Sequence, residues 1–160
     1  MMISDVYNKR ILALAGNIER LRRLDAPDAS ATAVSRLCGS KVTVDLCMEG
    51  DTVTDFGHEV KACALGQASS SLMARHVVGS SADELRALRQ QMYAMLKEEG
   101  DPPTGRWADF EVLLPVRGFK ARHASTLLTF DAVVDAIDQI EAERDGAAVM
   151  AGRPAHPAAG

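Results

Sequence analysis

Cys63 is the residue of this sequence whose position most strongly suggests chemistry. It stands where a strand-like segment ending at Lys61–Ala62 meets Ala64–Val78, a stretch with apolar residues at helical spacing. A cysteine at this junction lies near the first free N–H groups of the helix, which stabilise a thiolate over a thiol. A thiolate is both a nucleophile and a metal ligand. The alternative is that Cys63 is a small buried apolar residue, since free cysteine is often buried.

The other two cysteines stand in different settings. Cys38 is followed by Gly39 and Ser40 in a predicted turn, where glycine permits close approach of the backbone to a ligand. Cys47 lies within an alternating strand-like segment, and we interpret it as incidental. Three cysteines, an odd number, do not make a disulfide framework. They fit a reducing, cytoplasmic setting, in which spaced cysteines indicate metal binding or thiol chemistry.

The segment that begins at Cys63 resembles part of a known protein family. C-A-L-G-Q-A-S-S-S-L-M, followed by V-V-G, is similar to the cysteine–helix segment of the U-type iron–sulfur cluster assembly scaffolds, which include the NifU N-terminal domain, IscU and SufU. A serine-rich helix is otherwise unusual, because serine competes for backbone hydrogen bonds. The family carries C-G-D at the first cysteine, and this sequence matches it at Cys38-Gly39 but has Ser40 in place of the aspartate.

A third segment of the family has a cysteine shortly after F-x-A-R and before an apolar helix. Here the matching stretch begins at Phe119-Lys120-Ala121-Arg122, and an alignment on that motif and Leu128 places Ser125 at the cysteine position. An alignment on His123 alone would place Ala124 there, and neither residue is cysteine. The insertion before this segment resembles SufU more than IscU.

The resemblance implies a site at one end of the domain. In the family, three cysteines and an aspartate bind a nascent iron–sulfur cluster, or zinc in the SufU type. For this chain it implies Cys38 and Cys63 as cofactor and metal ligands and Cys63 as a sulfur acceptor. Ser125 and His123 are weaker candidates for metal ligands; neutral imidazole binds zinc and iron, but His123 also fits a structural role at a helix start.

The resemblance also implies partners and leaves three functions open. The partners are a cysteine desulfurase, which supplies sulfur, and apo iron–sulfur proteins; a homodimer is a further expectation. The leading function is an iron–sulfur cluster assembly scaffold. The alternatives are a zinc-dependent sulfurtransferase of SufU type and an interaction module that kept the fold and lost the metal site. Whether the protein is an enzyme stays open among these readings, although a scaffold or sulfur acceptor is not one.

Composition argues against several other classes of protein. The chain has 160 residues, of which 47% are hydrophobic and 25% charged, as in an ordinary soluble domain. With a net charge of −4 and no basic block, it offers little to nucleic acid. No apolar run is long enough to span a membrane, and the first ten residues lack the apolar core of a secretory signal.

The elements that must position the cysteines form an α+β fold. The resemblance implies a SufE/NifU-like domain over residues 1–145, with a small three-stranded antiparallel sheet and helices packed on one face, and a disordered Ala/Gly/Pro-rich tail over 146–160. A capping box at Ser81 and Glu84 opens one helix. Periodicity and turn residues predict strands at Thr32–Leu37, Lys41–Met48 and Thr52–Ala62, a bulge at Gly57, long helices at Ile3–Leu24, Ala64–Val78 and Phe119–Arg144, and a short helix or turn at Trp107–Leu114 that ends before Pro115.

Overall fold

Three antiparallel strands form the centre of the fold: β1 (Ala29–Val34), β2 (Lys41–Glu49) and β3 (Thr52–Lys61), paired in that order. This computed structural model describes residues 7–150, with side chains through residue 146. The apolar side chains that alternate along β2, from Val42 to Met48, are all buried, as predicted. The opposite face is not simply exposed, because Thr43 and Asp45 are buried as well.

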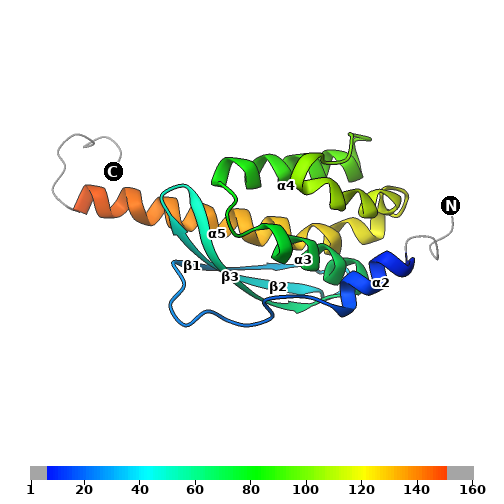
Figure 1. The fold of residues 1–160 in the computed structure, drawn as a ribbon, viewed down its shortest axis with the longest axis horizontal. Coiled ribbons are helices and arrows are strands. Elements are labelled where there is room, and N and C mark those ends of the chain that lie inside the picture. The colour runs from blue at the N-terminus through cyan, green and yellow to red at the C-terminus, as the bar shows by residue number, and fades with distance from the viewer. Residues whose placement is uncertain (1–6, 151–160) are drawn as a thin grey trace.

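The helices lie on one face of this sheet, as the sequence predicts. They are α2 (Lys9–Gly16), α3 (Ala64–His76), α4 (Ala82–Lys97) and α5 (His123–Met150), with 3-10 helices η1 (Gly105–Gly118) and η2 (Lys120–Arg122). α5 crosses β1 and β2, α3 lies beside α5, and α4 packs against α5 on the side away from the sheet (Figure 1). The predicted capping box of Ser81 and Glu84 opens α4. Within residues 7–150, no helix is long and apolar enough to cross a membrane.

The predicted helix Ile3–Leu24 is wrong over its second half. Helix α2 ends at Gly16, and residues 17–28, which we call the covering segment, run in irregular conformation along the sheet. The carbonyl of Arg20 accepts a hydrogen bond from the N–H of His58 at the free edge of β3 (3.2 Å). Leaving the buried N–H of His58 without a partner would cost free energy. Its hydrogen bond to Arg20 therefore favours an irregular chain over a longer helix at this point.

Gly57 serves the covering segment and does not form the predicted bulge. The register of β2 and β3 shifts between Cys47 and Met48, which leaves Thr54 as the extra residue. At Gly57 an added Cβ would collide with the carbonyl oxygen of Arg22. Glycine is therefore needed here because the covering segment passes directly over the strand.

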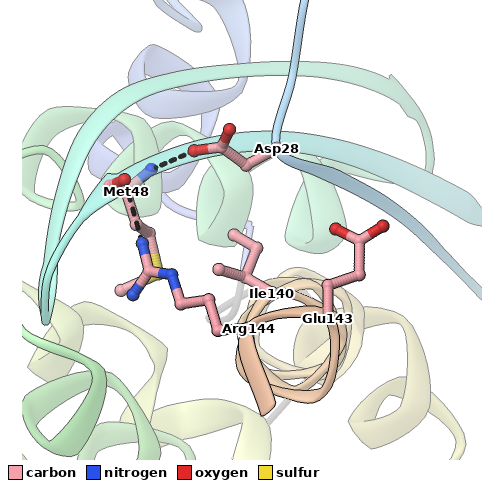
Figure 2. Close-up of a pocket in the computed structure, with 5 residues that line it drawn as sticks. All are labelled: Asp28, Met48, Ile140, Glu143 and Arg144. Atoms are coloured by element: carbon pink, nitrogen blue, oxygen red, sulfur yellow. Dashed lines mark hydrogen bonds between the residues drawn. The ribbon is translucent and has the colours of Figure 1, made fainter. Parts of the chain in front are cut away.

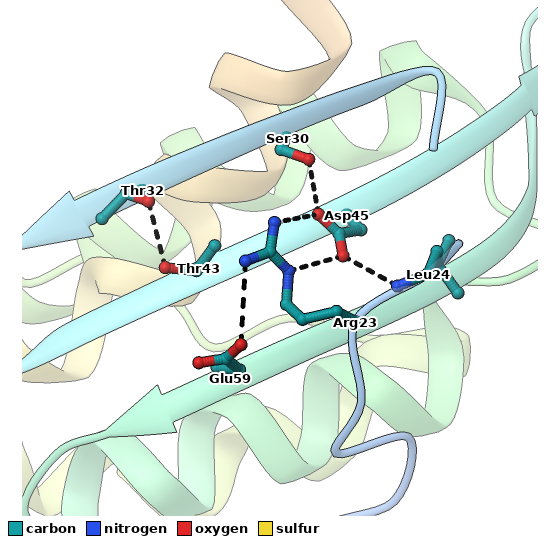
Figure 3. A network of polar contacts seen from close by, with 7 residues as sticks. All are labelled: Arg23, Leu24, Ser30, Thr32, Thr43, Asp45 and Glu59. Carbon is teal, nitrogen blue, oxygen red and sulfur yellow. Dashed lines mark hydrogen bonds and ion pairs between the residues drawn. The ribbon is translucent and has the colours of Figure 1, made fainter. Parts of the chain in front are cut away.

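Asp45 fixes the covering segment to the outer face of the sheet (Figure 3). Its fully buried carboxylate accepts two hydrogen bonds from Arg23 (2.7 and 3.0 Å), one from the N–H of Leu24 (2.9 Å) and one from the hydroxyl of Ser30 (2.5 Å). Burial alone would raise the pKa of Asp45, but these hydrogen bonds and the charge of Arg23 outweigh it and lower the pKa.

Three further boundaries differ from the predictions. The first strand ends at Val34 rather than Leu37, because Ser35 turns back to bond Ser40 through their backbones. The short helix is a 3-10 run that includes Pro115, whose fixed φ such a run accommodates. Helix α5 continues through Met150, so residues 146–150 are helical where we expected the disordered tail, consistent with the high helix propensity of alanine. The rest of that tail, 151–160, lies outside the described residues.

Candidate functional site

The strand register brings both family cysteines to one end of the sheet. Lys41, the first residue of β2, pairs with Val34 at the end of β1 and with Lys61 at the end of β3. Cys38 lies in the turn that joins β1 to β2, and Cys63 follows β3 by two residues. The tight turn between β2 and β3 lies at the opposite end, and α3 and α5 both begin at the cysteine end (Figure 1). The predicted common location is therefore observed.

Cys63 is the N-cap residue of α3 and lies against the start of α5. Its side chain makes no capping hydrogen bond, and its Sγ lies 3.4 Å from the Oγ of Ser125. Ser125 is 2% exposed and also donates to the carbonyl of Arg122 (3.2 Å). Gly66 permits this approach of the two helices, because an added Cβ would lie 3.1 Å from the carbonyl oxygen of Ser125. Ser125 therefore adjoins Cys63, as the alignment on F-x-A-R predicts.

Cys38 is an exposed thiol in a turn that favours its ionised form. Its Sγ lies 3.0 Å from the Oγ of Ser40 and 3.5 Å from the Oγ of Ser35. Hydrogen bonds with Ser40 and Ser35, together with the charge of Arg122, hold the pKa of the Cys38 thiol below its usual value. Gly39 has a φ of +72°, which glycine adopts without strain. The effect of Ser35 and Arg122 on this thiol was not predicted, although Ser35 lies three residues before Cys38 and Arg122 closes the F-x-A-R motif.

His123 is committed to a structural role in this conformation. The buried ring places Nε2 3.0 Å from the carbonyl oxygen of Val116 and 3.1 Å from that of Arg117. A nitrogen that donates to carbonyls has no lone pair for a metal. His123 as a metal ligand stays a prediction, and it would require these hydrogen bonds to break or the other ring nitrogen to be used.

The donor set does not complete a four-ligand metal site within one chain. Among residues 7–146, no group of three or more His, Cys, Asp or Glu side chains is placed to hold a metal ion. Cys38 and Cys63 contribute two thiols, and Ser125 and Ser40 contribute hydroxyls that stay protonated near neutral pH. Zinc sites and iron–sulfur clusters are completed by four thiolate, imidazole or carboxylate ligands.

Two cavities of the described structure lie away from the cysteines. A cavity of about 430 Å³ lies between β2 and α5 near their far ends and is lined by Asp28, Met48, Ile140, Glu143 and Arg144 (Figure 2). A second cavity, of about 280 Å³, lies between α2 and α3. Neither is lined by a cysteine. Cys47 lies toward the far end of β2, 3.6 Å from the carbonyl oxygen of Ala26, in accord with its incidental interpretation.

Comparison with known proteins gives relatives along most of the chain. Residues 6–105 match the family described as the NifU-like N terminal domain. The iron–sulfur cluster assembly scaffold protein IscU of Thermotoga maritima is 24% identical over 140 residues, which cover 88% of this chain and 98% of that protein. The protein of the same name from Streptococcus pyogenes serotype M1 is 27% identical over 100 residues, covering 62% of this chain and 63% of that protein.

Solved structures agree with this match. A nitrogen-fixing NifU-like protein (N-terminal) from Brucella abortus superposes with a TM-score of 0.86 at 67% sequence identity, covering 88% of this chain and 98% of that chain. FiSufU from Fervidobacterium islandicum AW-1, assigned as a scaffold protein for the SUF system, has a TM-score of 0.76 at 18% identity, covering 82% of this chain and 96% of that chain, and shares the fold. Because the family match spans more than half of the sequence, and a solved relative is 67% identical over an alignment that covers 88% of it, the chain belongs to the NifU-like N-terminal domain family.

Proposed function

We propose that this protein is a scaffold-like component of iron–sulfur cluster assembly that receives sulfur from a cysteine desulfurase. The observation that carries the proposal is the placement of two cysteines at one end of the sheet, with Cys38 exposed in a turn that favours its thiolate. Two similar proteins are named iron–sulfur cluster assembly scaffolds, which supports the same role.

The transfer of sulfur needs only a thiolate that a partner can reach. The thiolate of Cys38 attacks the outer sulfur of a persulfide on the desulfurase, and a new S–S bond forms as the S–S bond of the donor breaks. The donor cysteine leaves as a thiolate, so no oxidant or reductant is consumed. From the sequence, Cys63 is the expected sulfur acceptor. Because Cys63 is half-buried beside Ser125 and Cys38 is exposed, we assign the first transfer to Cys38 and retain Cys63 as a second acceptor.

A cluster as cargo requires more ligands than one chain provides. A two-iron cluster is held by about four thiolates. Two subunits, each presenting Cys38 and Cys63, would supply that number, which is the reason we propose a homodimer in the cluster-bound state. The assembled cluster would then pass to an apo iron–sulfur protein.

Sulfur loading tests the acceptor assignment. Metal-free protein is incubated with a cysteine desulfurase and cysteine, and mass spectrometry of its peptides locates the added sulfur. We expect sulfur on Cys38 first, loss of that signal in Cys38→Ala, and normal loading in the control Cys47→Ala. If folded wild-type protein gains no sulfur on Cys38 or Cys63, sulfur acceptance is contradicted.

Metal analysis separates the scaffold from its two alternatives. Protein purified without oxygen is analysed for iron and zinc, then supplied with ferrous iron and sulfide while its absorbance and size are followed. Cluster absorbance with dimer formation supports the scaffold. Stoichiometric zinc together with sulfur uptake supports a zinc-dependent sulfurtransferase. A folded protein that does neither is an interaction module.

A further inference from the structure

The end of the molecule that carries the cysteines differs in charge from the rest. Three segments meet there, residues 33–44, 60–71 and 112–130. Together they contain six of the 18 Lys and Arg residues of the chain and none of its 22 Asp and Glu residues. The protein as a whole has a net charge of −4, so this end is basic on a chain that is otherwise strongly acidic.

Five of these six cations are left without carboxylate partners. These five are Arg36, Lys41, Lys61, Lys120 and Arg122. None of them forms an ion pair in the described part of the chain. Arg122 is half-exposed and the other four are exposed. The sixth, Arg117, donates to the carbonyls of Met95 and Gly100 and so serves the fold. Most arginines farther from the cysteines meet a carboxylate, as Arg23, Arg86 and Arg89 do. Among the described residues, Lys9, Arg10 and Lys97 also lack an ion pair, but they are spread over α2 and α4 and are not gathered at one end of the sheet.

The arrangement of two lysines works against stability. Lys41 and Lys61 are direct cross-strand partners in the register of β2 and β3. Like charges directly opposite each other destabilise an antiparallel pair. The structure thus keeps an unfavourable contact beside the cysteines, which is expected where a positive surface serves binding rather than folding.

Leu37 adds an exposed apolar group to this end of the molecule. Its side chain is 80% exposed, whereas the other exposed large hydrophobic residues among those described are 54–56% exposed. It lies between Arg36 and Cys38 in the turn that presents the thiol. A buried apolar anchor surrounded by a polar rim is the usual anatomy of a protein interface.

We propose that Leu37 and the five cations Arg36, Lys41, Lys61, Lys120 and Arg122 form a docking surface, the basic rim, for an acidic protein surface with an apolar pocket that takes Leu37. The partner is the desulfurase that loads Cys38, so this inference rests on the proposed function. It adds that the desulfurase surface around its persulfide is acidic. Cys38 directly follows Leu37 in the turn between β1 and β2, so a partner that takes Leu37 also covers the thiol. An exposed leucine offers nothing to a phosphate backbone, which favours a protein over a nucleic acid.

Charge reversal with a matched control tests the basic rim. The double variant Lys41→Glu/Lys61→Glu replaces one like-charge pair by another and so preserves the local repulsion. The control, Lys9→Glu/Lys97→Glu, changes the net charge equally at exposed residues of α2 and α4. The association rate with a cysteine desulfurase is measured at low and high salt. At low salt we expect a loss of about tenfold or more for the rim variant and much less for the control, with a weaker salt dependence for the rim variant.

The apolar anchor is tested by dissociation. Leu37→Ala should raise the dissociation rate several-fold, while Leu12→Ala, an exposed leucine of α2, should leave it unchanged. If the desulfurase binds and loads wild-type protein but the rim variant associates at the wild-type rate, the inference fails and the proposed function stands. If wild-type protein neither binds nor receives sulfur, both fail. Equally strong binding of single-stranded RNA, abolished by the same charge reversal, would overturn the assignment to a protein partner.

Discussion

At the scale of single residues, a buried serine touches each retained cysteine. Ser40, in place of the family aspartate, lies 3.0 Å from the Sγ of Cys38, and Ser125, at the third cysteine position, lies 3.4 Å from the Sγ of Cys63. Both serines are buried, at 3% and 2% exposure. A hydroxyl beside a thiolate donates a hydrogen bond but is a poor metal ligand. At Cys38 this contact favours the thiolate, and neither serine supplies the third strong ligand that a metal site in one chain would need.

Ser125→Cys should strengthen zinc binding. A thiol with a pKa of about 8.5 is readily deprotonated by a bound metal, whereas a hydroxyl is not. We expect the zinc affinity to rise by more than about tenfold. Losing a contact to a metal ligand's outer shell already costs about tenfold in metal affinity, and a direct ligand should matter more. Competition against a chelator measures it, and adding Ser40→Asp should increase affinity further. As a control, Cys63→Ala in the Ser125→Cys background should remove the gain. An unchanged affinity in a folded Ser125→Cys protein would show that position 125 does not face the donor set.

At the scale of elements, small residues set the distance between α3 and α5. Gly66 lies against the backbone of Ser125, and the hydroxyl of Ser69 donates to the carbonyl of Thr126 (2.7 Å). These contacts hold the start of α3 beside the start of α5. The glycine and serine run of the family motif therefore has a packing role in addition to its diagnostic value.

Gly66→Ala should destabilise the protein by about 1–3 kcal/mol through overpacking. The added Cβ would lie 2.7 Å from the Cβ of Ala62 and 3.1 Å from the carbonyl oxygen of Ser125. This cost outweighs the gain of up to about 1 kcal/mol that alanine brings to a helix interior. Urea unfolding measures the difference. Gly16→Ala, where an added Cβ meets nothing within 4 Å, is the control and should not destabilise. Equal stability of both variants would mean that the helices separate freely.

Asp45→Ala should release the covering segment and cost about 3–5 kcal/mol, as is usual when one partner of a buried ion pair is removed. The pKa of Asp45 is lowered in the folded state, so its contribution is present above the unfolded value of about 3.9 and is lost as pH falls through the folded value. Urea unfolding at neutral pH and near pH 3 tests both statements. Asp55→Ala, which removes surface ion pairs to Arg20 and Arg22, should cost about 1 kcal/mol or less. A comparable loss in both variants would argue against a special role of Asp45.

At the scale of the whole molecule, α5 connects the two ends of the fold. Ser125 stands in its first turn beside Cys63, and Arg144 near its far end donates to the backbone carbonyls of Gly50 and Met48. Along its length, Asp131 accepts hydrogen bonds from Arg89 and Tyr93 of α4, and burial with this carboxylate raises the pKa of Tyr93 to about 12. Helix α5 is thus tied by polar contacts to α3 at its start, to α4 along its length and to the β2–β3 turn at its far end.

Stability should fall as pH drops below about 6.5, the pKa of an unperturbed histidine. The buried ring of His58 has Nε2 2.8 Å from the carbonyl oxygen of Glu19, and its Nδ1 has no partner in the described structure. Burial lowers the pKa of His58, so the folded state binds fewer protons than the unfolded state. The stabilisation of the neutral ring is therefore present above about 6.5 and is lost as pH falls toward the folded value. Urea unfolding from mildly acidic to alkaline pH should show this slope in wild-type protein and a flatter one in His58→Leu. An identical slope in both would assign the effect to other groups.

The sequence by itself determined those features that follow from local pattern. The alternation of apolar residues from Val42 to Met48 identifies the face of β2 that joins the core, because successive side chains of a strand point to opposite faces. The capping box of Ser81 and Glu84 depends on groups three residues apart. Cys63 is at a helix start because the apolar spacing changes from strand to helix there. Once the strands were known to be antiparallel, the turns with Cys38 and Cys63 had to share one end of the sheet.

The tertiary structure decided which distant groups meet. The apolar stripe of residues 3–24 predicts helix, yet residues 17–28 leave it because Asp45 and the edge of β3 offer partners that lie 20 or more residues away along the chain. The role of Gly57, the contact of Ser125 with Cys63 and the gathering of unpaired cations around Leu37 arise in the same way. Periodicity shows which face of one helix or strand is apolar. Contacts between elements that are distant in sequence depend on strand register and helix packing, which are set only when the chain folds.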